Sequence, residues 1–228
     1  MSDFTLIRFQ EQYDVARLSL ARPPLNIMTI EMMGEINQAL ERAAVNPSLK
    51  VLVIGGEGKA FSAGVAVEDH MGDRVKPMLE TFHQIFRGLR ALECMTLAAV
   101  QGPALGGGAE LATFCDFVVA SEAATLGQPE VKVGVFPPIA ALHYPKRVGL
   151  AQTLRLLCSG ETIGAAEAQR IGLVDRVVSA DKLPEAVDAE VERFRAQSAV
   201  VLRLTKRAVC DSAGVAFDEA LATLEELY

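Results

Sequence analysis

Short apolar runs alternate with amphipathic stretches along the first part of the chain. Residues 51–54 (Val-Leu-Val-Ile) precede two glycines, and residues 97–100 (Leu-Ala-Ala-Val) precede Gln-Gly-Pro, so both runs are typical of buried strands that end in turns. Between them, residues 79–89 carry large apolar side chains at the spacing of a helix that covers a core. This pattern predicts a strand, a helix and a second strand in succession.

Three further short runs extend this pattern. Residues 117–120 predict a third strand, residues 124–126 a short fourth one, and residues 174–178 a later one. Because the separations between the runs leave room for helical crossovers, parallel strands are expected. The fold class that follows is α/β.

The last fifth of the chain follows a different pattern. Amphipathic helical stretches occupy residues 183–194, 200–210 and 217–227, and polar or glycine-containing turns separate them. No Ser/Gly-rich linker and no exact internal repeat divides the sequence. We therefore expect a core over residues 1–180 that carries a helical C-terminal region over residues 181–228.

Composition narrows the possible classes of protein. The chain has 228 residues, of which 50% are hydrophobic and 22% charged, which suits one large globular domain with a substantial core. Its apolar runs are far shorter than the roughly 18 residues that a membrane-spanning helix needs, so we expect no membrane span. The N-terminal sequence lacks a basic segment followed by an apolar one, so no secretory signal is expected either.

Charge and cysteine content bear on partners and compartment. Lysine and arginine number 22 and aspartate and glutamate 29, so the net charge is −7, which argues against nucleic acid as a partner. This balance still allows a local basic pocket for a phosphorylated ligand. The four cysteines are widely spaced without a Cys-x-x-Cys pair, which predicts neither disulfides nor a zinc site. A cytoplasmic location is expected, because no secretory signal is visible in the sequence.

A glycine-rich stretch follows the second predicted strand. Residues 102–111 (Gly-Pro-Ala-Leu-Gly-Gly-Gly-Ala-Glu-Leu) let the backbone turn sharply and approach a ligand before a helix begins. Glu110 lies three residues after Gly107, so its carboxylate can share a pocket with the free N–H groups of the helix start. The alternative is a glycine-lined packing contact with Glu110 in solvent. The spacing matches neither a dinucleotide-binding fingerprint nor a P-loop.

Two further turns offer polar groups. Residues 58–65, after the first predicted strand, form a turn of small residues around an aromatic one that could present a second backbone N–H to the same oxygen. The other interpretation is an ordinary exit from a strand. Glu130, in the turn at residues 127–130, could pair with Glu110 for acid–base chemistry or stand exposed on the surface.

These motifs together resemble the enoyl-CoA hydratase/isomerase family, the crotonases. The resemblance rests on five segments in the same order and covers about residues 18–206. The segments are residues 59–64 (KAFSAG), 102–111 (GPALGGGAEL), 115–116 (CD), 127–130 (GQPE) and 172–174 (GLV). Membership implies a crotonase-like spiral of ββα units with a C-terminal helical extension, assembly as a homotrimer or dimer of trimers, and an acyl-CoA thioester as the substrate.

The resemblance implies roles for particular residues. The oxyanion-hole donors fall on the backbone N–H groups of Val65 and Gly107, and the two catalytic glutamates on Glu110 and Glu130. Two carboxyl groups suit hydration, because one deprotonates a water molecule as it attacks the β-carbon while a proton reaches the α-carbon. The thioester oxygen takes up negative charge against the two N–H dipoles. No metal or redox cofactor is implied, since coenzyme A is part of the substrate.

The resemblance also implies contacts to the rest of the substrate. Arg22, Lys59 and Lys206 are candidates for the phosphates of coenzyme A, or are solvated surface charges. Contacts to the thioester arm and the acyl group are implied for five small or apolar residues, although core packing is the alternative for aromatic ones. These residues are Ala60, Ala63, Val67, Phe82 and Phe136.

Two departures from the family pattern concern the acyl pocket. Ala66 stands where many linear-chain hydratases carry Asp, and residues 136–143 replace their Pro-Gly-rich stretch after the second glutamate. A bulkier wall stiffened by proline implies an acyl pocket of different shape. Residues 134–138 and 65–70 look like those of the cyclohexa-1,5-diene-1-carbonyl-CoA hydratases, so a cyclic dienoyl-CoA is the expected substrate. Linear-chain hydration, double-bond isomerisation and non-catalytic binding of acyl-CoA are the alternatives.

The C-terminal helices bear on assembly. Crotonases commonly run some tens of residues longer and end in helices that cover the active site and contact a neighbouring protomer. This sequence stops at Tyr228, at the helical stretch of residues 217–227. We therefore expect residues 181–228 to serve oligomerisation and to cover the active site incompletely.

Overall fold

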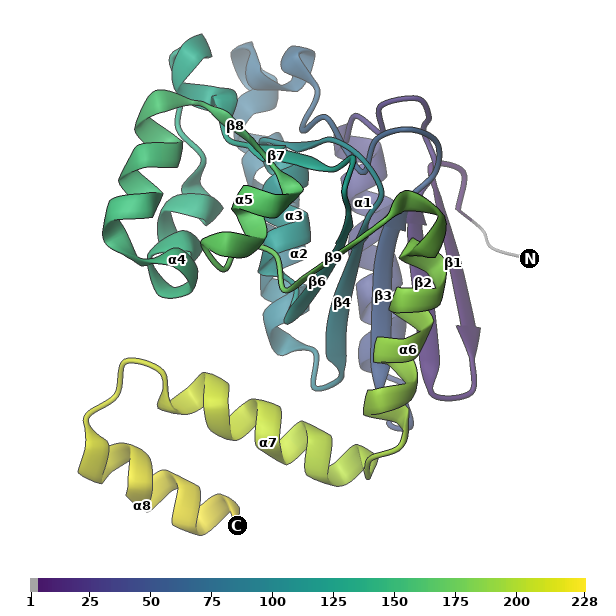
Figure 1. Ribbon diagram of the computed structural model, residues 1–228, viewed down its shortest axis with the longest axis vertical. Coiled ribbons are helices and arrows are strands. Elements are labelled where there is room, and N and C mark those ends of the chain that lie inside the picture. The colour runs from purple at the N-terminus through teal and green to yellow at the C-terminus, as the bar shows by residue number, and fades with distance from the viewer. Residues whose placement is uncertain (1–3) are drawn as a thin grey trace.

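A computed structural model describes residues 4–228, and a six-stranded sheet forms its centre (Figure 1). The strand order across this sheet is β1-β2-β3-β4-β6-β9. β1 and β2 form an antiparallel hairpin, and every other neighbouring pair in the sheet is parallel. The strands are β1 (Ile7–Gln12), β2 (Val15–Leu20), β3 (Val51–Gly56), β4 (Met95–Val100), β6 (Phe117–Ser121) and β9 (Arg176–Val178).

Helices cover both faces of this sheet, which explains why its inner strands are apolar runs. Helices α1 (Ile30–Ala44) and α2 (Val75–Ala91) pack on one face and enclose the larger core. Helix α6 (Leu183–Arg195) packs on the other face, where Val187 contacts a smaller core that includes Val53 of β3. A strand buried from both sides needs no polar alternation, so its sequence is continuously hydrophobic.

A second, three-stranded sheet has the order β5-β7-β8 and lies beyond the carboxyl ends of the large sheet's inner strands (Figure 1). Each of two inner strands leads first into this small sheet and then into a helix. β4 is followed by β5 (Ala104–Leu105) and α3 (Gly107–Phe114), and β6 by β7 (Thr125–Gly127) and α4 (Pro138–Ser159). The expected succession of ββα units in an α/β fold is therefore confirmed.

Short elements complete the body of the protein. They are β8 (Thr162–Gly164), α5 (Ala165–Arg170), and the 3-10 helices η1 (Val67–His70), η2 (Gly72–Arg74), η3 (Pro129–Val133) and η4 (Ala180–Lys182).

The predicted strands and helices are all present, although some of their ends shift. β9 begins two residues later than predicted, because the N–H groups of Leu173 and Val174 both donate to Ala168 O and hold a turn there. The hairpin β1–β2 was not predicted, since buried and exposed positions alternate along it and leave no apolar run. Helices α1 and α4 also lie where no element was predicted.

The last two helices differ from the rest of the fold. Helix α7 (Ala199–Ser212) runs past the amino ends of the strands and α8 (Phe217–Leu227) lies beyond it (Figure 1), and neither contains a buried residue. The region over residues 181–228 is helical as expected, but α6 within it packs on the large sheet. The part without buried residues therefore begins at α7. Between residues 4 and 228, none of the helices is long and apolar enough to cross a membrane.

Candidate active site

Two loops meet beyond the carboxyl ends of β3 and β4. The first loop, residues 57–66, follows β3, and the second, residues 101–106, follows β4. Backbone hydrogen bonds join them, since Phe61 N donates to Pro103 O at 3.0 Å and Leu105 N to Ser62 O at 2.9 Å. The two turns that the sequence singled out are therefore side by side in the structure.

Glycines make this close approach possible. A Cβ atom at Gly102 would overlap the carbonyl oxygen of Lys59, and one at Gly108 would overlap that of Ser62. Gly106 has a φ of +52°, a conformation that favours glycine, and it turns the chain directly into α3. The glycine-rich stretch thus serves both as a packing contact and as the start of a helix.

The two predicted oxyanion-hole residues lie next to each other. Among the described residues, neither the Val65 N–H nor the Gly107 N–H has a hydrogen-bond acceptor. A Cβ atom at Gly107 would lie 2.9 Å from both Val65 Cγ2 and Phe82 Cζ, so these side chains border the same point. Gly107 is also the first residue of α3, whose N-terminal N–H groups favour a negative charge.

Glu110 is buried inside the protein and not in solvent. Only 2% of the residue is exposed, and its Oε1 accepts a hydrogen bond of 2.7 Å from Ala140 N in the first turn of α4. Burial raises the pKa of Glu110 to about 8; the Ala140 N–H opposes the rise and the nearby Glu130 carboxylate adds to it. At neutral pH the Glu110 carboxyl group is therefore mostly protonated.

Glu130 approaches the same place from η3. A Cβ atom at Gly106 would lie 2.7 Å from Glu130 Oε1, so this carboxylate rests against the turn that leads to Gly107. Burial raises the pKa of Glu130, while a backbone hydrogen bond and the nearby His70 oppose the rise. Two carboxyl groups in one poorly solvated region disfavour each other's ionisation, which agrees with the raised pKa of Glu110.

Gln128 and Tyr144 form a buried support behind Glu130. Gln128 Oε1 accepts a hydrogen bond of 2.9 Å from Tyr144 Oη, and Gln128 Nε2 donates to both Glu130 carboxylate oxygens at 3.2 Å. Burial raises the pKa of Tyr144 to about 12, so its hydroxyl remains a donor. Neither residue was predicted as part of the site, and only the position of Gln128 in the GQPE segment offered a signal.

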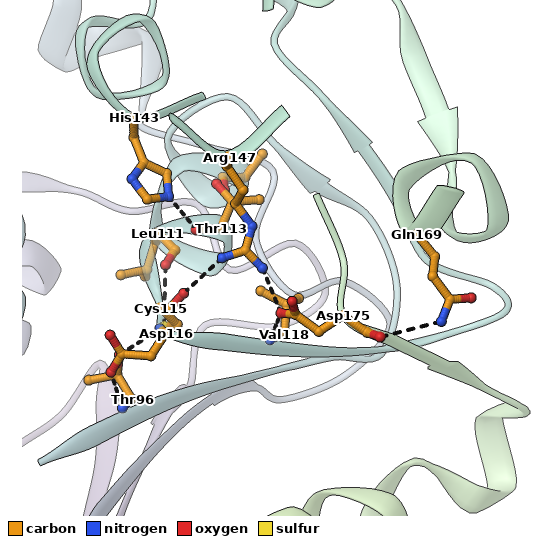
Figure 2. Close-up of polar contacts among 11 residues, drawn as sticks. Thr96, Leu111, Thr113, Cys115, Asp116, Val118, His143, Arg147, Gln169 and Asp175 are labelled. Atoms are coloured by element: carbon orange, nitrogen blue, oxygen red, sulfur yellow. Dashed lines mark hydrogen bonds and ion pairs between the residues drawn. The ribbon is translucent and has the colours of Figure 1, made fainter. Parts of the chain in front are cut away.

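Polar contacts hold α4 against its neighbours (Figure 2). The first turn of this helix carries the Ala140 N–H that bonds Glu110. His143 Nε2 donates to Thr113 O at 2.9 Å, and Arg147 bonds both Cys115 O and the Asp175 carboxylate. Burial lowers the pKa of His143, which keeps the ring neutral. This histidine therefore ties α4 to α3 and has a structural role.

The neutral state of Glu110 gives stability a dependence on pH. The carboxyl pKa is about 8 in the folded protein against an ordinary 4.5, so the folded state binds more protons between these values and stability falls as pH rises through them. Glu110→Gln should remove this loss and make the variant more stable than wild type above about pH 8, by on the order of a few kcal/mol. Urea unfolding at low and high pH measures the effect, with the exposed Glu225→Gln as control. Parallel pH dependences for all three proteins would contradict it.

The remaining predicted contact residues divide by position. Arg22 and Lys59 are not enclosed and follow β2 and β3 at the edge where the two donors lie. Arg22 Nη1 donates to Ile27 O at 3.0 Å, and among residues 4–228 its Nε and Nη2 have no hydrogen-bond acceptor. Ala60 is buried and Ala63 half-buried in the first loop.

The apolar candidates differ in burial and in their closeness to the donors. Phe82 is buried and borders Gly107, as described above. Val67 begins η1 and Phe136 precedes α4, and both are exposed, at 72% and 71%. Ala66 is buried and donates its N–H to Met28 O at 2.9 Å, so it is part of the first loop's framework.

The structure places Lys206 away from the two donors. Its Nζ lies 2.7 Å from both Asp116 Oδ2 and Cys94 O, at the amino ends of β4 and β6. The donors and glutamates lie at the opposite ends of these strands. The expected contact between Lys206 and the substrate is therefore not formed within this chain, and the lysine instead ties α7 to the sheet.

This placement predicts a structural effect for Lys206→Met. The change leaves a half-buried Asp116 carboxylate without its cation, so the free energy of unfolding should fall by about 2 kcal/mol. The KM for an acyl-CoA should remain within about twofold, since no substrate contact is lost. Urea unfolding and saturation kinetics measure both, with the exposed Lys76→Met as control. A KM that rises severalfold without loss of stability would restore Lys206 to the substrate site.

Within residues 4–228, no three His, Cys, Asp or Glu side chains gather in the way that would hold a metal ion. The chemistry that the described groups offer is that of a buried acid, a neighbouring carboxylate and two N–H donors.

Comparison with known proteins agrees with this geometry. The model of the family described as enoyl-CoA hydratase/isomerase matches residues 10–226. A cyclohexa-1,5-dienecarbonyl-CoA hydratase of Thauera aromatica is 39% identical over 218 residues, which cover 93% of this chain and 82% of that protein. A probable enoyl-CoA hydratase of Rhizobium meliloti is 35% identical over 231 residues, covering 100% and 90%.

A solved structure extends the likeness to the fold. The crystal structure of an enoyl-CoA hydratase from Bacillus anthracis matches with a TM-score of 0.94 at 27% identity, covering 98% of this chain and 90% of that one. The sequence match, the spiral of ββα units and the paired glutamates beside two free N–H groups agree with one another. The chain belongs to the enoyl-CoA hydratase/isomerase family.

Proposed function

We propose that the protein adds water to an α,β-unsaturated acyl-CoA thioester, and that this thioester is a cyclic dienoyl-CoA such as cyclohexa-1,5-diene-1-carbonyl-CoA. The observation that carries the proposal is the buried Glu110 carboxyl group together with the half-buried Glu130 carboxyl group, beside the free N–H groups of Val65 and Gly107. An isomerase needs no group to activate water, so two carboxyl groups at one site favour hydration.

In the proposed reaction, one of the two glutamates is protonated and the other is ionised. The ionised carboxylate accepts a proton from water as the water oxygen bonds to the β-carbon. Electrons of the double bond move toward the thioester oxygen, where the Val65 and Gly107 N–H groups stabilise the enolate. The protonated carboxyl group then donates its proton to the α-carbon. The carboxyl groups exchange protonation states, and a proton transfer between them restores the starting state.

Two observations support a cyclic acyl group. The relative from Thauera aromatica is named a cyclohexa-1,5-dienecarbonyl-CoA hydratase and is 39% identical over 93% of this chain. The wall after Glu130 also departs from the pattern of linear-chain hydratases, because Pro137 and Pro138 stiffen the start of α4 beside the carboxyl pair. A linear enoyl-CoA is the second candidate, because a crotonyl-CoA hydratase of Syntrophomonas wolfei is 32% identical over 95% of this chain.

The proposal includes how the rest of the substrate binds. Arg22 and Lys59 would contact the phosphates of coenzyme A, because both lie at the edge of the sheet that carries the donors. Coenzyme A enters as part of the substrate, so we propose no separate cofactor. We also propose a cytoplasmic homotrimer or dimer of trimers, in which the exposed apolar residues of α7 and α8 contact another protomer.

Assays with two thioesters test this function. Crotonyl-CoA and cyclohexa-1,5-diene-1-carbonyl-CoA are incubated with the purified protein, and loss of the conjugated thioester absorbance is followed in water labelled with oxygen-18. Labelled hydroxyacyl-CoA from the cyclic ester, formed faster than from crotonyl-CoA, is the expected result. Isomerised product without label would identify an isomerase. Binding of both esters without reaction would identify a non-catalytic acyl-CoA-binding protein.

A further inference from the structure

The two oxyanion-hole donors lie on separate segments of the chain. The Val65 N–H belongs to the loop after β3, while the Gly107 N–H belongs to the start of α3. An oxyanion hole lowers the barrier only when both donors point at the same oxygen, and a displacement of about 1 Å in such a site can cost roughly a hundredfold in rate. Some group must therefore hold the two segments in register.

Ser62 is hydrogen-bonded both to the segment that leads to Gly107 and to the loop that carries Val65. It is wholly buried, its N–H donates to Pro103 O at 3.2 Å, and its carbonyl accepts from Leu105 N at 2.9 Å. These two bonds join the first loop to the segment that ends at Gly107. The Ser62 hydroxyl donates to Asn26 O at 2.8 Å and accepts from Gly64 N at 3.2 Å.

The hydroxyl's acceptor is itself held in place. Asn26 is wholly buried with a φ of +49°, and its Nδ2 donates to Ala60 O at 2.8 Å and to Phe61 O at 3.1 Å. Its Oδ1 accepts from Arg22 N at 3.0 Å. A buried residue that satisfies this many backbone groups moves little, so Asn26 O is a stable point of attachment for Ser62.

The segment that contains Asn26 also bonds the residues on either side of Val65. Met28 N donates to Gly64 O and Ala66 N donates to Met28 O, each at 2.9 Å. The residues before and after Val65 are thereby bonded to residue 28, while the Val65 N–H is left free. The Ser62 hydroxyl, which bonds Gly64 N, closes this arrangement next to the donor itself.

We propose that Ser62 is a positioning residue of the oxyanion hole: its hydroxyl fixes the direction of the Val65 N–H relative to the Gly107 N–H. The inference rests on the proposed hydration of an acyl-CoA. Ser62 does not contact the substrate, because Gly64 N, Asn26 O and the packed Gly108 surround its side chain. Its loss should therefore weaken stabilisation of the enolate and leave binding of the ground-state ester unchanged.

Ser121 supplies a matched control for the loss of a buried hydroxyl. It is also wholly buried, its Oγ donates to Gln101 O at 2.7 Å, and it accepts from Ala123 N at 3.2 Å. The two serines thus make the same pair of bonds, one to a carbonyl and one to the N–H two residues later. Ser62→Ala and Ser121→Ala should cost similar stability but differ in their effect on catalysis.

Kinetics give the first test. Ser62→Ala should lower kcat by about 10- to 100-fold with KM within about twofold, and Ser121→Ala should keep kcat within about twofold. Urea unfolding checks that both variants remain folded. If Ser62→Ala does not fold, Ser62→Cys retains the volume with a weaker donor and should still lower kcat. A folded Ser62 variant with the kcat of Ser121→Ala would overturn the proposal.

Infrared spectroscopy gives the second test. It distinguishes failure of the proposed role of Ser62 from failure of the proposed hydration of an acyl-CoA. Cyclohexa-1,5-diene-1-carbonyl-CoA labelled with carbon-13 at its carbonyl is bound to Glu130→Gln, in which turnover is slowed enough for the bound ester to be observed. The carbonyl stretch should shift to lower frequency on binding, and Ser62→Ala in the same background should return part of that shift. A shift that survives unchanged overturns the role of Ser62 alone. Absence of any shift, or of binding, in Glu130→Gln overturns the proposed oxyanion hole and with it this inference.

Discussion

Glu110→Gln and Glu130→Gln should each lower the kcat of hydration by about 10²- to 10⁴-fold, the range that general acid–base groups contribute. Glutamine keeps the size of the side chain, and at position 110 it can still accept the hydrogen bond from Ala140 N. What it lacks is a group that can donate or accept a proton. Each variant keeps only one of the two glutamates, and the proposed addition needs one carboxylate to accept the proton from water and a second carboxyl group to deliver a proton to the α-carbon.

Substrate binding should respond much less than catalysis. The Val65 and Gly107 N–H groups and the edge with Arg22 and Lys59 are untouched, so KM should stay within about threefold. Steady-state kinetics and titration with a CoA ester measure this, and the exposed Glu122→Gln serves as control. A Glu110 or Glu130 variant that retains more than about a tenth of wild-type kcat would contradict a mechanism that needs both carboxyl groups.

The sequence predicted those strands whose burial produces a continuous run of apolar residues. Residues 51–54 and 97–100 form strands covered on both faces, so hydrophobicity alone identified them. The hairpin β1–β2 lies at an edge and alternates buried with exposed positions, so it offered no apolar run. Helix α4 contains Pro145 and a non-helical Gly149, and these interrupt the periodicity by which a helix is recognised.

The site shows a similar division. The glycines of residues 102–108 and the positions of Glu110 and Glu130 were visible as local motifs. The Ala140 N–H that binds Glu110 was not, because a backbone donor carries no residue type and depends on how α4 begins. Lys206 was misplaced for a related reason, since its position in a helical segment does not tell which end of the sheet that helix crosses.

Burial of Glu110 links stability to catalysis in this protein. The carboxyl group has a pKa of about 8 because it is buried away from water. The proposed addition uses its protonated form as the acid that protonates the α-carbon. Stability and catalysis are also linked in the two loops, where the backbones lie so close together that only glycine fits. Tight packing there gives the N–H donors a fixed direction, and it leaves little tolerance for change.

Of the two glycines in α3, Gly108 should therefore tolerate replacement by alanine less well, with a larger loss of both kcat and stability. The new Cβ would overlap Ser62 O and lie 2.7 Å from Ser62 Cβ, and these atoms belong to or adjoin the backbone, so no flexible side-chain end can move aside. The start of α3 must then move away from the first loop, which separates the Gly107 N–H from the Val65 N–H. We expect kcat to fall by about a hundredfold or more and stability by about 1–3 kcal/mol.

The control is Gly34→Ala in α1, where a Cβ atom would meet nothing within 4 Å. The same added methyl group should there stabilise the helix by about 0.5–1 kcal/mol and leave kcat unchanged. Saturation kinetics and urea unfolding of both variants measure these effects. Because the added methyl group is the same, the comparison separates the effect of crowding at Ser62 from the general effect of replacing a helical glycine by alanine. Equal kcat values for folded Gly108→Ala and Gly34→Ala would mean that catalysis tolerates a change in the distance between the two loops, and the oxyanion hole would lose its geometric basis.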